Sequence, residues 1–125
     1  MYSVSVSRNI IAQHYLTVPD PGPEGKLHSH RYTVEATLRG AELDERAYLV
    51  NIDRLCETMD ALAAFYSDRT LNDLEAFEGA NPSTERFARC FGDRLLEQLD
   101  PDGVSELRIA IDEDDVASVA HERTL

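Results

Sequence analysis

The sequence of 125 residues has few cysteines, almost no lysine and no long apolar run. No apolar segment approaches the ~20 residues that span a membrane, so we expect no membrane association. Its two cysteines, Cys56 and Cys90, do not make a disulfide framework, and we expect core thiols because both lie in helix-like segments. The N-terminus lacks the basic and apolar regions of a signal peptide, which favours a cytoplasmic protein.

The charge of the chain is strongly acidic. It has 24 acidic and 12 basic residues, Lys26 is its single lysine, and its formal net charge is −12. A field of this sign repels nucleic acid, so we expect no nucleic-acid partner. Acidic, lysine-poor surfaces are typical of proteins from a salt-loaded cytoplasm, where high ionic strength screens the self-repulsion. The composition therefore indicates a halophilic source.

Hydrophobic periodicity predicts four strands and two helices. Apolar and polar residues alternate, as in half-buried strands, over residues 2–13, 28–39, 104–112 and 116–123. Apolar residues at spacings of three and four predict amphipathic helices over residues 52–66 and from residue 82 to 99. We expect Asn51 to cap the first helix, and Asn81 to cap the second with Pro82 at its first position. The polar stretch before Ala80 is expected to be a loop.

The resulting order, β-β-α-α-β-β, predicts one α+β domain over residues 1–125. An antiparallel four-stranded sheet with both helices packed on one face would bury every apolar pattern. The edge strands of such a sheet remain open, and open edges need covering or pairing. We therefore expect the protein to associate with itself.

Three of the four histidines lie close together around the start of the second predicted strand. His28 and His30 share a face if this segment is extended, because successive side chains alternate. His14 lies near the end of the preceding strand, which is expected to pair with this one in a hairpin. Three imidazoles at one place make a plausible zinc site with its fourth position open for water or substrate. The alternative is a pair of solvent-facing histidines.

Six short motifs follow one another along the chain. They are Ala12-Gln13-His14, His28-Ser29-His30, Tyr48-Leu49-Val50-Asn51-Ile52, Leu71-Asn72-Asp73, Asn81-Pro82-Ser83-Thr84-Glu85 and Glu113. In this order they resemble the family of 6-pyruvoyl-tetrahydropterin synthase and 6-carboxy-tetrahydropterin synthase, and the resemblance covers nearly the whole chain. No single motif is specific, but six in one order argue against a chance match.

The resemblance implies the tunnelling fold (T-fold), in which the sheets of several subunits close into a barrel. It implies a homohexamer built as a dimer of trimers, with active sites between subunits. It also implies that His14, His28 and His30 bind zinc. In this family zinc holds the side-chain hydroxyls of 7,8-dihydroneopterin triphosphate and makes them more acidic.

The resemblance further assigns residues that contact the pterin. A carboxylate of the family accepts hydrogen bonds from the amino-pyrimidine edge of the ring, and its position here is Glu113. Ser83 and Thr84 lie in the region where the family also contacts the pterin, although capping of the second helix explains them equally well.

Three positions depart from the family pattern. The usual catalytic cysteine, four residues before the paired histidines, is Glu24 here. The usual Asp-His pair before the Leu-Asn motif is Ser67-Asp68, and the glycine between the paired histidines is Ser29. An ionised Glu24 near zinc could act as a general base, and Asp68 could supply a second proton-transfer group. The opposing interpretation is a solvated loop residue in a protein that has lost the family's chemistry.

Family members that carry glutamate in place of the cysteine resemble enzymes that cleave the substrate side chain. Our hypothesis is therefore a zinc-dependent pterin synthase or lyase that acts on 7,8-dihydroneopterin triphosphate and releases 6-hydroxymethyl-7,8-dihydropterin. One alternative is a 6-carboxy-5,6,7,8-tetrahydropterin synthase in the biosynthesis of modified guanines (queuosine or archaeosine). The other is a non-catalytic oligomer that binds a pterin or a metal.

Overall fold

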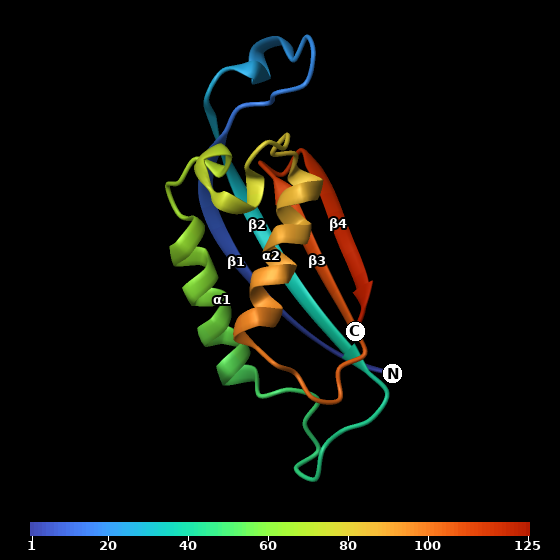
Figure 1. The fold of residues 1–125 in the computed structure, drawn as a ribbon. Helices are drawn as coiled ribbons and strands as arrows, with labels where there is room; N and C mark the ends of the chain where they lie inside the picture. Colours follow the sequence, from blue (N-terminus) through green and yellow to red (C-terminus); the bar gives the residue numbers. More distant parts are fainter.

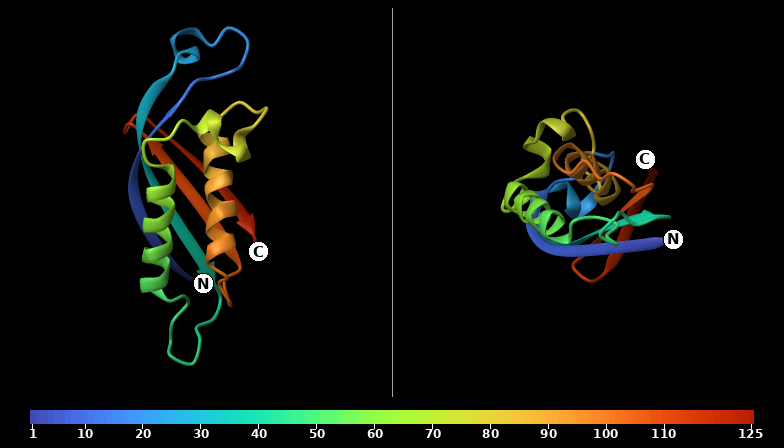
Figure 2. Two further views of the ribbon diagram at one scale, coloured as in Figure 1. Left: turned by 60° about the vertical axis from the view of Figure 1, so that its left-hand side comes forward. Right: turned by 90° about the horizontal axis from the view of Figure 1, so that it is seen from below.

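A computed structural model describes residues 1–125 as a four-stranded antiparallel sheet with two helices on one face (Figure 1). The strands lie in the order β1-β2-β3-β4. Their bounds, with those of the helices, are β1 Tyr2–His14, β2 His28–Gly40, α1 Ile52–Tyr66, α2 Thr84–Gln98, β3 Glu106–Glu113 and β4 Ala117–Thr124. The predicted order β-β-α-α-β-β is confirmed, and the sheet and helix layers are separate when the molecule is turned (Figure 2). Neither helix has the length and apolar character needed to span a membrane.

The register of the sheet decides what lies at its functional end. β1 and β2 pair along their whole length, so that His14 lies directly opposite His28. β2 and β3 pair from Tyr32, opposite Glu113, to Arg39, opposite Glu106. The end of β1, the start of β2 and the end of β3 therefore meet at the same end of the sheet. The loop between β1 and β2 projects beyond that end (Figure 1).

The core lies between the sheet and the helices, as the alternation predicts. The side chains of Tyr32, Val34, Ala36 and Leu38 on β2 are fully buried, whereas their neighbours on the other face are half-buried or exposed. The uncovered sheet face is polar, and residues such as Ser5 and Thr37 hydrogen-bond across it at 2.7 Å. Of the two cysteines, Cys90 is buried and Cys56 only half-buried. The prediction of core thiols is therefore right for the second and only partly right for the first.

The first helix begins as predicted, but the second does not. Asn51 caps α1, because its side-chain oxygen accepts from the Arg54 amide at 3.1 Å. Helix α2 begins at Thr84 with Ser83 as its cap, so the predicted capping role of Asn81 is wrong. The Asn81 side chain instead accepts a hydrogen bond from the Thr17 amide at 2.9 Å and holds the long loop. This loop contact is distant in sequence, so local capping rules do not reveal it.

Two further boundaries differ from the prediction. The segment expected to be a plain loop contains two one-turn 3₁₀ helices, η2 (Leu71–Asp73) and η3 (Glu75–Phe77), in which Leu71 and Phe77 are buried. Glu113 belongs to β3 rather than to the turn after it, because it pairs with Tyr32 on one side and Ala117 on the other. The turn that follows, residues 114–116, therefore has the predicted length but is shifted by one residue along the chain.

Candidate metal centre

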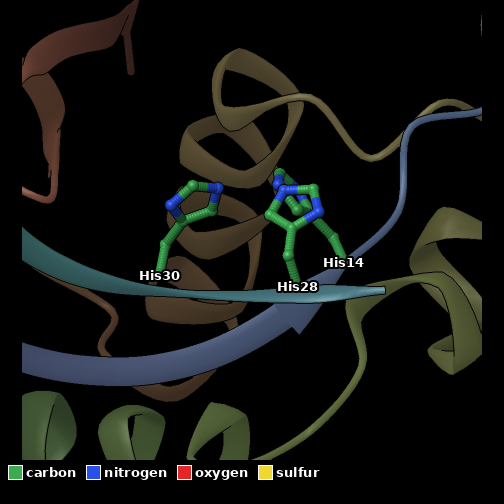
Figure 3. Close-up of side chains that lie close together, drawn as sticks. All are labelled: His14, His28 and His30. Atoms are coloured by element: carbon green, nitrogen blue, oxygen red, sulfur yellow. The ribbon is translucent and has the colours of Figure 1, made fainter. Parts of the chain in front are cut away.

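The three predicted histidines meet at the functional end of the sheet. His14 is the last residue of β1, and His28 and His30 lie at the start of β2 (Figure 3). One nitrogen of each ring lies within 4.8 Å of the corresponding nitrogens of the other two. The ring centroids are 4.6 Å apart for His14 and His28, 4.7 Å for His28 and His30, and 5.1 Å for His14 and His30. The juxtaposition expected from the sequence is therefore present.

Each of these imidazoles is anchored through its Nδ1 atom. His14 Nδ1 lies 2.9 Å from the carbonyl oxygen of Pro82, and His28 Nδ1 lies 2.7 Å from that of Lys26. His30 Nδ1 is hydrogen-bonded to the carboxylate of Asp114. Carbonyl and carboxylate oxygens only accept, so Nδ1 donates in all three cases and the proton of each neutral ring resides there. Nε2 is then the atom that each ring offers to a metal.

These residues fit a zinc ion by two criteria. Nε2 of His28 and of His30 is buried and has no hydrogen-bond partner, which is a costly state for a polar atom unless it has a ligand. Metal-binding histidines commonly donate their other nitrogen to a backbone carbonyl or a carboxylate, and all three rings do so here. Three neutral imidazoles form a donor set that zinc accepts with one position left open.

The electrostatics of the cluster favour neutral rings. Burial is the main cause that lowers the pKa of His14, and the neighbouring His28 and His30 lower this pKa further. The hydrogen bond to Pro82 acts in the opposite direction and is outweighed. A proton therefore competes weakly with a metal for His14 near neutral pH.

Two further carboxylates, in addition to that of Asp114, lie beside His30. Single ligand atoms of Glu24, His30 and Glu113 all lie within 4.8 Å of one another. Glu113 accepts a hydrogen bond from the buried hydroxyl of Thr84, and its Oε1 lies 3.5 Å from His30 Nε2. The Ser83 hydroxyl oxygen accepts a hydrogen bond from the Arg86 amide at 3.2 Å and so caps α2. The structure thus brings Glu24, Thr84 and Glu113 to the histidines.

The loop between β1 and β2 turns Glu24 back toward the histidines. Glu24 lies in the short 3₁₀ helix η1 (Gly22–Gly25), and its carbonyl accepts from the Leu16 amide at 2.9 Å. A Cβ atom at Gly25 would lie only 2.6 Å from Pro21 Cγ, so the compact loop requires glycine there. These contacts give an exposed residue a defined position near the candidate metal centre.

Asp68 does not join this group within one subunit. Its backbone amide donates to the carbonyl of Ile11 at 2.7 Å, along the outer edge of β1. Its φ of +61° is in the left-handed region, which aspartate tolerates better than most residues. No hydrogen bond or group of candidate metal ligands connects Asp68 to the histidines. Its catalytic role stays a prediction.

Sequence reasoning missed two residues at this site. The alternation over residues 28–39 identifies Tyr32 only as a strand residue, yet its ring centroid lies 5.7 Å from that of His30, and its hydroxyl is buried without a partner. Burial, followed by the charges of Glu113 and Asp114, raises the pKa of Tyr32, which keeps the phenol neutral. Asp114 lies between the third and fourth predicted strands, and its contact with His30 depends on a strand register that no local motif reveals.

The fold and the site together define a tunnelling-fold α+β protein with a three-histidine candidate metal centre. The model of the 6-pyruvoyl tetrahydropterin synthase family matches residues 3–124, so the chain belongs to that family. It is 30% identical over 103 residues to 6-carboxy-5,6,7,8-tetrahydropterin synthase of Bacillus subtilis strain 168, an alignment that covers 79% of this chain and 68% of the relative.

Solved structures show the same fold at lower sequence identity. A 6-pyruvoyltetrahydropterin synthase of Plasmodium vivax, in a variant whose catalytic glutamate is replaced by alanine, superposes with a TM-score of 0.82 at 14% identity, covering 99% of this chain and 98% of that one. The 6-pyruvoyl tetrahydropterin synthase of Caenorhabditis elegans superposes with a TM-score of 0.79 at 20% identity, covering 98% and 97%. At these identities the structures support the fold alone.

Proposed function

We propose that this protein is a zinc-dependent enzyme that acts on the C6 side chain of 7,8-dihydroneopterin triphosphate. The observation that carries the proposal is the set of three imidazoles, each anchored through Nδ1 to an oxygen and free at Nε2. Zinc bound there would supply a Lewis acid that makes the side-chain hydroxyls of the substrate more acidic. Membership of the pterin synthase family supplies the class of substrate.

The carboxylates of the chain have separate roles in this proposal. Glu113 holds the pterin ring by accepting hydrogen bonds from its amino-pyrimidine N–H groups, and the hydroxyl of Thr84 orients the carboxylate for that purpose. Glu24 accepts a proton from the substrate side chain, because its carboxylate lies beside His30. Ring binding and proton transfer thus come from different carboxylates beside His30.

The product favoured by the sequence relationship is 6-carboxy-5,6,7,8-tetrahydropterin, since the relative in Bacillus subtilis is a synthase of that compound. Release of 6-hydroxymethyl-7,8-dihydropterin is the second candidate. It is favoured by Glu24, which stands where a cysteine is usual and lies within reach of His30. The Plasmodium vivax protein of this fold also has a catalytic glutamate.

A neighbouring subunit is proposed to complete the site. Hollows of about 350 Å³ occur at the far end of β3 and before α1, and neither is lined by a histidine. Small-molecule sites normally enclose most of their ligand, so a pterin at the open end of this sheet needs further walls. The outer strands β1 and β4 offer edges for pairing with other copies. Asp68, on the outer edge of β1, would then act as proton-transfer group in the site of an adjacent subunit.

Incubation of the zinc-loaded protein with 7,8-dihydroneopterin triphosphate, followed by separation of the pterins, tests the proposal. The carboxy-pterin identifies the first candidate reaction and the hydroxymethyl-pterin the second. Unchanged substrate that remains tightly bound would contradict catalysis and indicate a pterin-binding oligomer.

The role of Glu24 is tested by Glu24→Gln, which keeps the shape of the side chain but removes its basicity. We expect a loss of turnover of about 100-fold or more, in the range of general-base catalysis, with zinc content unchanged. Asp20→Asn is the matched control, because Asp20 is exposed in the same loop and the substitution makes the same change of charge. Equal turnover of the two variants would remove Glu24 from the mechanism.

A further inference from the structure

The turn between β3 and β4 is attached to β2 at the candidate metal centre. Asp114 uses both carboxylate oxygens on neighbouring donors of β2: Oδ1 accepts from the backbone amide of Arg31 at 2.8 Å, and Oδ2 accepts from Nδ1 of His30. The backbone amide of Asp114 donates in turn to the carbonyl of Arg31 at 2.9 Å. The carboxylate is therefore held against the edge of the imidazole from two directions.

Asp114 is the only carboxylate among the three oxygen groups that anchor the histidines. His14 and His28 are anchored by backbone carbonyls, which no side-chain substitution removes. His30 depends on a side chain, so the state of its ring depends on the identity of residue 114. Nε2 of His30 is buried and makes no hydrogen bond, since Glu113 Oε1 lies 3.5 Å away, so the bond to Asp114 is the one hydrogen bond that selects a tautomer of this ring.

We propose that Asp114 is a positioning residue of the metal centre, which holds His30 in the tautomer protonated at Nδ1 and leaves Nε2 unprotonated to face the metal. This inference rests on the zinc site of the proposed function. The carboxylate also makes Nε2 of the imidazole a stronger electron-pair donor to the metal, which is the usual effect of a carboxylate bound to the other ring nitrogen. Asp114 thereby acts through His30 and touches neither metal nor substrate.

Asp114→Asn tests the proposal because it keeps the shape of the side chain, while it removes the charge and replaces one accepting oxygen with a donating NH₂ group. The carboxamide has one accepting oxygen and one donating nitrogen, whereas the two donors of β2 require two acceptors. If the oxygen stays on the Arg31 amide, the NH₂ group faces His30 Nδ1 and favours the tautomer protonated at Nε2. That proton occupies the lone pair that the metal needs. We expect zinc affinity to fall about 10- to 100-fold.

Asp115→Asn is the matched control. Asp115 lies in the same turn, also at a left-handed φ, but its carboxylate contacts only the exposed guanidinium of Arg31, at 2.5 Å. Both substitutions remove one negative charge from the same turn. A loss of affinity in both variants would indicate a general effect of charge and would overturn the positioning role of Asp114.

The measurements are zinc affinity by chelator competition and the tautomer of His30 from ¹⁵N chemical shifts of the metal-free protein. The proposal expects the Nδ1–H form in the wild type and in D115N, and a shift toward the Nε2–H form in D114N together with weaker zinc binding. Unchanged affinity and tautomer in D114N would overturn the role of Asp114 while leaving the zinc site intact. A wild-type protein that binds no zinc would overturn the zinc site, and the positioning role with it.

Discussion

Gly25→Ala should impair turnover by displacing Glu24, with a much smaller effect on zinc binding. A Cβ atom at residue 25 would lie 2.6 Å from Pro21 Cγ and 3.4 Å from Pro21 Cβ. Carbon atoms in contact prefer about 3.5–4.0 Å, so the two segments must separate by roughly 1 Å. Glu24 is the adjacent residue, and a displacement of about 1 Å can cost about 100-fold in rate when a group must be aligned. The histidines lie on strands outside this contact and only the Lys26 carbonyl that anchors His28 is adjacent to it, so zinc affinity should fall far less than turnover.

The assay compares turnover of 7,8-dihydroneopterin triphosphate and zinc affinity in Gly25→Ala, Pro21→Ala and the double variant. Removal of Cγ in Pro21→Ala takes away the atom at 2.6 Å, so the double variant should recover most of the lost turnover. Pro21→Ala alone should lower stability by no more than about 1 kcal/mol, through the freedom it adds to the unfolded chain. Turnover of Gly25→Ala within about twofold of the wild type would refute the argument. Parallel loss of zinc affinity would also refute it, because the effect would then lie at the histidines.

Four further outcomes are expected. Tyr32→Phe should leave stability unchanged or raise it by up to about 1 kcal/mol in denaturant unfolding, because the hydroxyl it removes is buried without a partner; a clear loss would reveal a partner. Burial is the main cause that lowers the pKa of His14 and of His121 in the folded protein. On acidification the unfolded chain therefore takes up protons first, and the metal-free protein should lose stability as pH falls below about 6.5. His121→Gln should flatten this pH dependence without changing zinc affinity, and an unaltered slope would contradict the assignment. Phe87 is buried and packs against Tyr32 and Tyr66, so Phe87→Ala should lower the free energy of unfolding by about 3–5 kcal/mol in thermal or denaturant unfolding. A loss below about 1 kcal/mol would contradict tight packing there.

The elements of the fold were predictable because their signals are local. Alternation over residues 28–39 determined which side of β2 faces the core, and the same alternation places His28 and His30 together. His14 followed from the hairpin, whose pairing sets it opposite His28. These features depend on side-chain periodicity and on strands adjacent in sequence.

The parts of the site that could not be predicted depend on distant contacts. Asp114 reaches His30 only because β3 pairs with β2 in one register, and the two residues are 84 positions apart. Asn81 was assigned to a helix cap by its local pattern, but the Thr17 amide, far away in sequence, binds its side chain. Glu24 was identified by resemblance to a family, and its approach to His30 depends on packing of the loop against itself. Local propensity contains no information about such pairings.

The most direct test of the central claim is X-ray absorption spectroscopy of the zinc-loaded protein, combined with metal analysis. We expect one zinc per chain with three imidazole nitrogens at about 2.0–2.1 Å and one further light ligand. We also expect His28→Ala to lose the metal. The claim would be contradicted by a protein that retains no zinc after loading, or by a sulfur ligand at about 2.3 Å, which would place the metal on a cysteine.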